Sequence, residues 1–204
     1  LEKKYNVIGL SRTSKDIRFD LSNTEKIKNL YHNDIKKFSP IYGLINNAAI
    51  AYDDLATNMN LDSLKRMYEV NVFSTFMLTK YIIRDMLLNK TQGSIVHISS
   101  ISAHTGYKGL SMYASTKGAL EAYSKNISRE WGRLGIRSNV VCPGFMMTDM
   151  SSSITGPQKD KIFKRNSYMS ELRVSDVAKT IEFLVSKDSN GITGQVIHVD
   201  NGTL

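Results

Sequence analysis

Short apolar runs alternate with longer stretches of helical periodicity along almost the whole chain, and this alternation restricts the fold more than any other feature. Strands are expected at residues 5–10, 17–19, 42–45, 94–99, 137–142 and 195–199. Helices are expected at residues 23–38, 61–88, 112–134 and 174–186, with Asn23 capping the first. Strands that alternate with helices of this length form βαβ units, which pair in parallel through right-handed crossovers. The pattern therefore predicts a doubly wound α/β sheet with helices on both faces.

Composition narrows the class of protein. A chain of 204 residues has the size of one domain. Its net charge of +8 is spread along the sequence instead of forming a basic run interleaved with aromatic residues, which argues against nucleic-acid binding. No apolar run is long enough to predict a membrane-spanning helix. Because Cys142 is the only cysteine, no intramolecular disulfide can form, and we expect a cytoplasmic protein.

Polar and turn-forming residues follow several of the expected strands. In parallel sheets of this kind, ligands bind beyond the carboxyl ends of the strands. The residues at these positions are Ser11-Arg12, Asp20, Asn46-Asn47, Ser99-Ser100 and Pro143-Gly144. We therefore expect a ligand site along this edge of the sheet.

Tyr113 and Lys117 lie four residues apart in an expected helix, so their side chains share one face. A nearby ammonium lowers the pKa of a tyrosine, which can then exchange a proton with a carbonyl or alcohol oxygen near neutral pH. Ser100, at a strand end, could hydrogen-bond the same oxygen. Asn71 is a poor helix former in mid-helix, where it could hold a backbone group or a water that connects to Lys117. Each residue alone has an ordinary structural explanation, whereas the four together favour a catalytic site.

Longer motifs identify a family. They are Asn46-Asn47-Ala48-Ala49 after a strand, Asn71 in the long helix, Ser100 thirteen residues before Tyr113, Tyr113-Ala114-Ser115-Thr116-Lys117, Pro143-Gly144 followed by Thr148-Asp149-Met150, Ile192-Thr193-Gly194-Gln195, and His198-Val199-Asp200-Asn201-Gly202. In these motifs the whole chain resembles the short-chain dehydrogenase/reductases of the classical subgroup. Within that family it is most similar to the 3-oxoacyl-acyl-carrier-protein reductases.

The resemblance implies a Rossmann sheet that binds a nicotinamide dinucleotide, and it implies roles for four catalytic residues. Tyr113 is then the general acid in the reduction direction, and Lys117 lowers its pKa and holds the nicotinamide ribose. Ser100 orients the substrate carbonyl, and Asn71 positions a water behind Lys117. The residues implied to line the cofactor are Asn47 and Ala48 on the adenosine side and Pro143, Gly144, Met146 and Thr148 on the nicotinamide side. Residues 145–164 would form a lid over the substrate.

The choice between NAD and NADP depends on Arg12. Rossmann sites that bind NAD usually place an acidic residue at the end of the second strand, against the ribose 2′-hydroxyl. This chain has Ser11-Arg12 there, and an arginine pairs well with the 2′-phosphate of NADP. Asp20 and Leu21 would lie against the adenine. We therefore expect NADP(H) as the cofactor.

The sequence also departs from the family. The first strand and its Gly-rich TGxxxGxG loop are absent, Leu1-Glu2-Lys3-Lys4 has the character of a last helical turn, and we expect roughly 20–25 residues before Leu1. The strands at 5–10 and 42–45 would then flank a gap. Thr91 and Leu134 stand where the carrier-protein reductases carry docking arginines, with Lys90 and Arg133 beside them. The four histidines show no metal-ligand spacing, so no metal is expected.

The leading hypothesis is NADPH-dependent reduction of a ketone to a secondary alcohol. The resemblance implies a 3-oxoacyl thioester on acyl carrier protein as the substrate, fatty acid synthesis as the context and a homotetramer as the assembly. A sugar, polyol or other small-alcohol dehydrogenase with the same four catalytic residues is the alternative within the family. A catalytically silent binding scaffold is the alternative outside it, because the phosphate-binding loop is absent.

Overall fold

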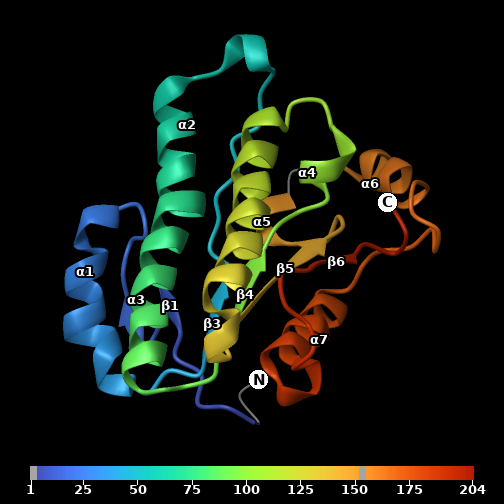
Figure 1. Ribbon diagram of the computed structural model, residues 1–204. Helices are drawn as coiled ribbons and strands as arrows, with labels where there is room; N and C mark the ends of the chain where they lie inside the picture. Colours follow the sequence, from blue (N-terminus) through green and yellow to red (C-terminus); the bar gives the residue numbers. More distant parts are fainter. Residues whose placement is uncertain (1–3, 152–154) are drawn as a thin grey trace.

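Four parallel strands form the centre of the protein (Figure 1). The computed structural model describes residues 4–151 and 155–204. The strands β3 (Gly43–Asn46), β4 (Ser94–Ile98), β5 (Arg137–Pro143) and β6 (Val196–Val199) lie side by side in that order, all parallel. Every residue of β4 and β5 is buried, as expected for inner strands of a sheet covered on both faces. The expected strands in this part of the chain are confirmed to within one residue at each end.

Alternate residues of β4 separate the two faces of this sheet. Ile95 belongs to a core cluster with residues of α3 (Ser74–Leu88) and α5 (Ser111–Trp131). Its neighbour Val96 belongs to a second cluster, formed with residues of α7 (Val174–Val185). Successive side chains of a strand point to opposite faces, so α3 and α5 cover one face and α7 the other. This is the doubly wound arrangement that the alternating pattern predicts.

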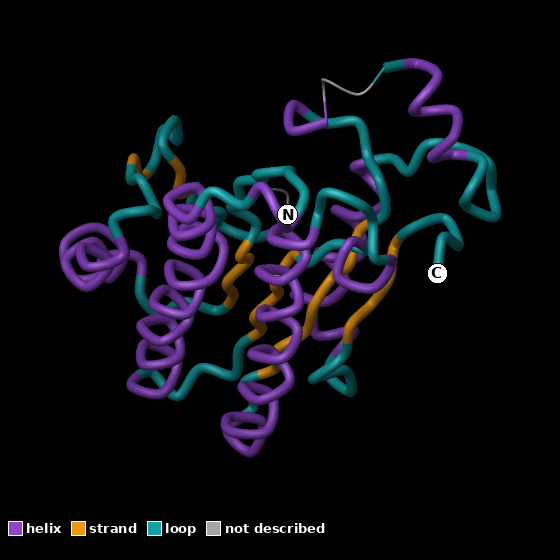
Figure 2. Tube along the Cα trace, turned by 90° about the horizontal axis from the view of Figure 1, so that it is seen from above, coloured by secondary structure: helices purple, strands orange, loops and turns teal. Residues whose placement is uncertain are grey.

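A second pair of strands lies apart from the four, as Figure 2 shows. The strands β1 (Leu10–Ser11) and β2 (Ile17–Arg18) pair in parallel with each other, and within the described residues no ladder joins them to β3. The strand expected at residues 5–10 is therefore mostly wrong, because only Leu10 is extended in a ladder. Tyr5 instead stacks on Tyr42, with ring centroids 6.1 Å apart, and Lys4 pairs with Glu182 at 2.8 Å. Residues 1–3, expected to end a helix, lie outside the described residues.

The long helices follow the predicted ranges but are not regular. The first helical segment joins a 3₁₀ turn, α1 (Ile27–Leu30), a π-helical turn and a second 3₁₀ turn, ending at Phe38. Asn23 stands at its start, but its side chain makes no capping hydrogen bond, so the expected cap is wrong. The second segment joins α2 (Leu61–Tyr68), a π-helical turn at Glu69–Phe73 and α3. The turn Gly132–Leu134 extends α5 to the predicted end.

Two short helices were not predicted. They are α4 (Ser102–Thr105), which follows β4, and α6 (Gly156–Phe163), which lies in the segment expected to form a lid. In α6 the backbone N–H of Thr155 donates to the Gln158 side chain at 3.0 Å, a local arrangement that stabilises the helix start. Residues 152–154 of the expected lid lie outside the described residues.

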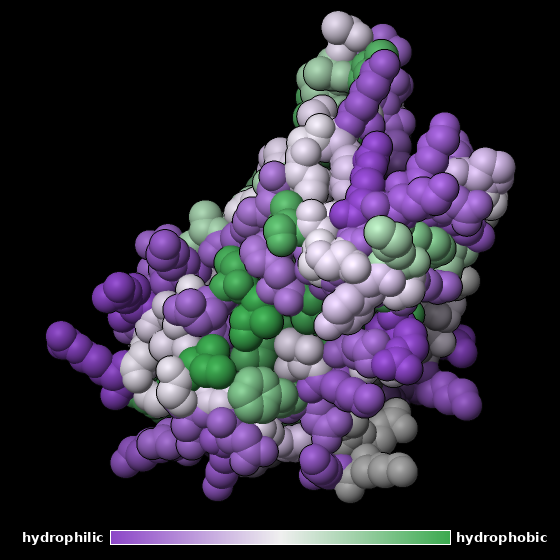
Figure 3. Space-filling model, turned by 90° about the vertical axis from the view of Figure 1, so that its right-hand side faces the viewer, coloured by the Kyte–Doolittle hydropathy of each residue, from purple (hydrophilic) through white to green (hydrophobic). Residues whose placement is uncertain are grey.

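The surface over α7 and β6 exposes apolar side chains next to a strongly hydrophilic region (Figure 3). Val174 and Phe183 of α7 are among the exposed apolar residues. Within the described residues, no helix has both the length and the apolar character needed to cross a membrane.

Candidate active site

Asn71 lies at the centre of the π-helical turn between α2 and α3, fully buried. Its Oδ1 accepts from the Ile50 N–H at 2.8 Å, and its Nδ2 donates to the Ile50 carbonyl at 2.9 Å. The same Nδ2 also lies 3.1 Å from Oγ1 of Thr116, the residue before Lys117 in α5. Asn71 therefore holds a backbone group, one of the two tasks considered for it, and joins the loop after β3 to α5.

Lys117 is buried on α5, one helical turn beyond Tyr113. Its Nζ donates to the Ile98 carbonyl at the end of β4, at 2.8 Å, and lies 5.5 Å from the centroid of the Tyr113 ring. The predicted common face of the two side chains is thus confirmed. An ammonium has three hydrogens to donate, and the described residues provide a hydrogen-bond acceptor for one. The donors that remain match the hydroxyls of a bound ribose.

The pKa values of this pair differ from the expectation. Burial raises the pKa of Tyr113 to about 12, and the negative charge of Asp53 adds to the effect. Burial also lowers the pKa of Lys117 to about 8. The expected depression of the tyrosine pKa is therefore wrong for the chain by itself, because desolvation of the buried phenol favours its protonated form. Tyr113 is consequently protonated at neutral pH, which is the state that a proton donor needs.

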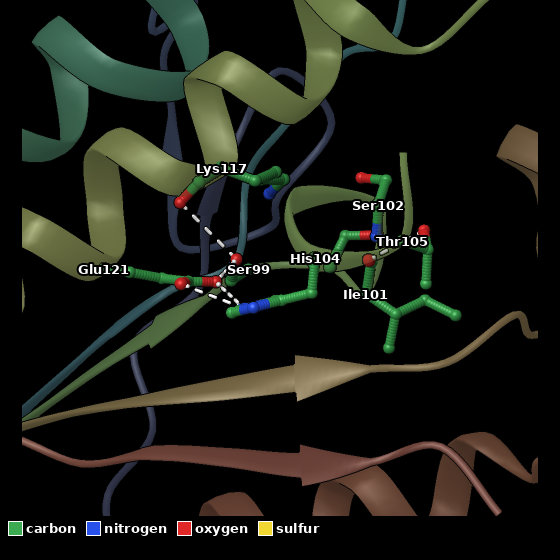
Figure 4. A network of polar contacts seen from close by, with 8 residues as sticks. Ser99, Ile101, Ser102, His104, Thr105, Lys117 and Glu121 are labelled. Atoms are coloured by element: carbon green, nitrogen blue, oxygen red, sulfur yellow. Dashed lines mark hydrogen bonds and ion pairs between the residues drawn. The ribbon is translucent and has the colours of Figure 1, made fainter. Parts of the chain in front are cut away.

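Ser100 follows β4 and is half-buried. Its Oγ accepts from the Ser102 N–H at 3.2 Å, which leaves the hydroxyl hydrogen for another partner. The neighbouring Ser99 belongs to a different network, drawn in Figure 4, in which its Oγ donates to Glu121 at 2.5 Å. Glu121 in turn contacts His104 Nε2 at 3.0 Å. Ser100 thus lies at the expected edge of the sheet, while Ser99 ties β4 to α5.

The residues expected at the adenosine end lie beyond β1 and β2. Ser11 and Arg12 are exposed. Two hydrogen bonds from Ser22, at 3.0 and 2.9 Å, are the main reason that the pKa of Asp20 lies below its usual value, with a smaller effect from the charge of Arg12. Arg12 and Asp20 therefore follow the two paired strands β1 and β2 at the same end. Leu21 is buried in the core, so its backbone, and not its side chain, is available to an adenine.

The remaining cofactor-lining residues also follow strand ends. Asn47 and Ala48 are exposed immediately after β3, while Pro143 ends β5 and Gly144 follows it. A Cβ at Gly144 would lie 2.8 Å from Cα of Asp200, so this position is restricted to glycine by the backbone beside it. Met146 is half-buried and Thr148 is exposed. The direct contact of each with a cofactor stays a prediction.

Three structural features around the Tyr113–Lys117 pair were not predicted from the sequence. They are the Ile98 carbonyl, Thr116, and the Ser99–Glu121–His104 network. A backbone acceptor has no sequence signal. Thr116, by contrast, stands between Tyr113 and Lys117 in the motif, and its place on the helix directs it away from them towards Asn71.

Comparison with known proteins identifies the family. A family model described as Enoyl-(Acyl carrier protein) reductase matches residues 4–203. The chain is 34% identical over 186 residues to the 3-oxoacyl-acyl-carrier-protein reductase FabG of Buchnera aphidicola subsp. Baizongia pistaciae, covering 91% of this chain and 76% of that protein. For FabG of Haemophilus influenzae the identity is 32%, covering 95% and 79%.

Comparison with solved structures points to the same family. The structure described as ElxO with NADP bound has a TM-score of 0.83 at 31% identity, covering 91% of this chain and 76% of that one. A 4-hydroxyisoleucine dehydrogenase complexed with NADH has a TM-score of 0.89 at 29% identity, covering 99% and 88%. Together with the Rossmann-like sheet and the Tyr113–Lys117 pair, these matches show that the chain belongs to the short-chain dehydrogenase/reductase family of oxidoreductases.

Proposed function

We propose that this protein reduces a ketone to a secondary alcohol with NADPH, and that its substrate is a 3-oxoacyl thioester carried by acyl carrier protein. The observation that carries the reaction type is the buried Lys117 ammonium under the ring of Tyr113, beside the carboxyl end of β4. A protonated phenol next to a buried cation is suited to donate its proton to an oxygen on which negative charge develops.

The chemistry divides between cofactor and protein. When bound, NADPH supplies the hydride that adds to the carbonyl carbon. Tyr113 gives its hydroxyl proton to the carbonyl oxygen, so that a C–H and an O–H bond replace the C=O π bond. Lys117 stabilises the phenolate that remains and holds the ribose through its unused donors, while Ser100 donates to the substrate oxygen. Asn71 keeps the Ile50 loop and Thr116 in place behind Lys117.

The preference for NADPH rests on Arg12. A guanidinium at the end of β1 matches the 2′-phosphate, and Asp20, which could compete for it, is held by Ser22. ElxO, described with NADP bound, supports this assignment. The 4-hydroxyisoleucine dehydrogenase is described in complex with NADH instead, so the affinities for NADPH and NADH have to be compared directly.

The carrier-bound substrate is supported by the FabG relatives and by the net charge of +8, which suits an acidic partner. Lys90 and Arg133, which stand beside the positions of the docking arginines, lie in neighbouring turns before β4 and β5, joined by the hydrogen bond from Gly93 N–H to the Gly135 carbonyl at 3.2 Å. These turns are at the amino ends of the strands, opposite to Tyr113. The two cations therefore do not flank the site within one chain. A homotetramer in the cytoplasm is part of the same proposal.

The similarity to 4-hydroxyisoleucine dehydrogenase keeps a second candidate, oxidation or reduction of a small alcohol or ketone by the same four residues. One experiment separates the candidates. The consumption of NADPH and of NADH is followed with an acetoacetyl thioester, and the reverse reaction with hydroxyamino acids, sugars and polyols. Thioester-dependent NADPH oxidation is expected. Activity with small alcohols alone would favour the second candidate, and failure to bind either dinucleotide would favour the silent scaffold.

A further inference from the structure

Three metal-ligating side chains from three separate elements meet on the α5 side of the sheet. They are Cys142 of β5, His198 of β6 and His104 of α4, and one donor atom of each lies within 4.8 Å of the other two. The register of the sheet pairs Cys142 directly with His198, and the rings of His104 and His198 meet edge to face at 4.9 Å.

The alternation of the strands explains why these side chains gather there. Val141, Ile197 and Val199 pack in the core cluster that contains α7. Cys142 and His198, which alternate with them along β5 and β6, therefore point to the opposite face, towards α4 and α5. The spacing of Cys142, His104 and His198 along the chain does not predict this cluster, because the cluster depends on strand register and on the position of α4.

We propose that Cys142, His104 and His198 form a Zn²⁺ site. One thiolate and two imidazoles make a donor set that suits Zn²⁺, which binds Cys and His in tetrahedral geometry. At ordinary Zn–S and Zn–N lengths, tetrahedral ligand atoms lie about 3.4–3.6 Å from each other. Rotation of the exposed His198 side chain would close the present separation of up to 4.8 Å towards that value, while Glu121 holds His104. The fourth position is left for a water or another ligand.

A carboxylate already orients one of the ligands. Oε1 of Glu121 lies 3.0 Å from Nε2 of His104 and also accepts a hydrogen bond from the Ser99 hydroxyl, as Figure 4 shows. A carboxylate on one ring nitrogen keeps the hydrogen there and leaves the lone pair of the other nitrogen for a metal. This is the arrangement that commonly supports histidine ligands, and the reaction assigned to Tyr113 makes no use of it.

The test uses the untagged full chain and does not measure hydride transfer, so its result is independent of the proposed function. Co²⁺ is titrated into the reduced protein, and the absorption spectrum is recorded. A 1:1 complex is expected, with a thiolate-to-cobalt charge-transfer band and the strong visible bands of tetrahedral coordination. Competition with Zn²⁺ should abolish both, and Zn²⁺ should raise the melting temperature.

Variants identify the ligands. Cys142→Ser should remove the charge-transfer band, and His198→Gln, on an exposed position that does not threaten folding, should weaken Co²⁺ and Zn²⁺ binding at least tenfold. Glu121→Gln should weaken binding by about tenfold or more through loss of the orienting carboxylate. His32→Gln, on α1's side of the protein, is the matched control and should bind as the parent does. An octahedral cobalt spectrum, no binding, or equal affinity in His198→Gln would overturn the proposal.

Discussion

Replacing Lys117 by methionine removes a buried ammonium while keeping most of the side-chain volume. Burial lowers the pKa of Lys117 from 10.5 to about 8, a shift that corresponds to about 3.4 kcal/mol of destabilisation when the group is charged. The lost hydrogen bond to the Ile98 carbonyl offsets about 1 kcal/mol of this gain. At pH 7 and without cofactor, Lys117→Met should therefore be more stable than the parent by about 2 kcal/mol, or about 4–8 °C in melting temperature.

The pH dependence makes the test specific. Below pH 8 both folded and unfolded Lys117 hold the proton, so the penalty is fully present. Between pH 8 and 10.5 the folded state releases the proton before the unfolded state does, and the parent gains stability as the pH rises. By pH 10 the parent should have recovered about 2.5 kcal/mol relative to the variant.

Thermal unfolding followed by circular dichroism at several pH values between these limits measures the difference. Lys125→Met is the matched control, because it makes the same substitution at an exposed position of the same helix. A gap between Lys117→Met and the parent that stays constant from pH 7 to pH 10, or a variant that is less stable at pH 7, would refute the reasoning.

Three further outcomes follow from the site and the core. Tyr113→Phe should cut ketone reduction by roughly a hundredfold or more while NADPH binding, followed by fluorescence titration, stays near the parent value; turnover within a factor of two would reject the proton-donor role. Arg12→Ala should weaken NADPH far more than NADH, whereas Arg18→Ala, exposed on β2, should affect neither; equal losses would reject the 2′-phosphate assignment. Burial lowers the pKa of His97 from 6.5 to about 3, so stability is fully present above pH 6.5 and is lost as the pH falls towards 3, by about 3 kcal/mol at pH 4. Denaturant unfolding should show this loss in the parent and in His32→Gln but not in His97→Asn, and a parallel loss in all three would contradict it.

The parts of the fold that the sequence predicts well are those whose signal is local. β4 and β5 are continuous buried runs, and their ends differ from the expected ones by one residue. The Tyr113–Lys117 face follows from helix geometry alone. The strand expected at residues 5–10 fails because a ladder needs a neighbour, which an apolar pattern does not provide. The short helix α4 carries too few residues to show a periodicity.

The site shows the same division. Residue identities and their positions at strand ends are readable in the sequence, whereas electrostatics are not. The pKa of Tyr113 depends on how deeply α5 packs and on Asp53 in a distant loop, and both reverse the expected direction. The gathering of Cys142, His104 and His198 depends on a strand register that spacing along the chain does not encode.

The π-helical turn at Glu69–Phe73, which holds Asn71, sets the relative rotation of α2 and α3. Each residue of an α-helix advances the side-chain direction by about 100°. Deleting one residue from this turn to restore a regular helix would swing α2 through about that angle and carry Tyr68 away from Ser115, which its hydroxyl now reaches at 3.0 Å. The π-helical turn thus sets the rotation between α2 and α3. Two parts of one continuous helical segment therefore contact α5, the helix that bears Tyr113, in different directions.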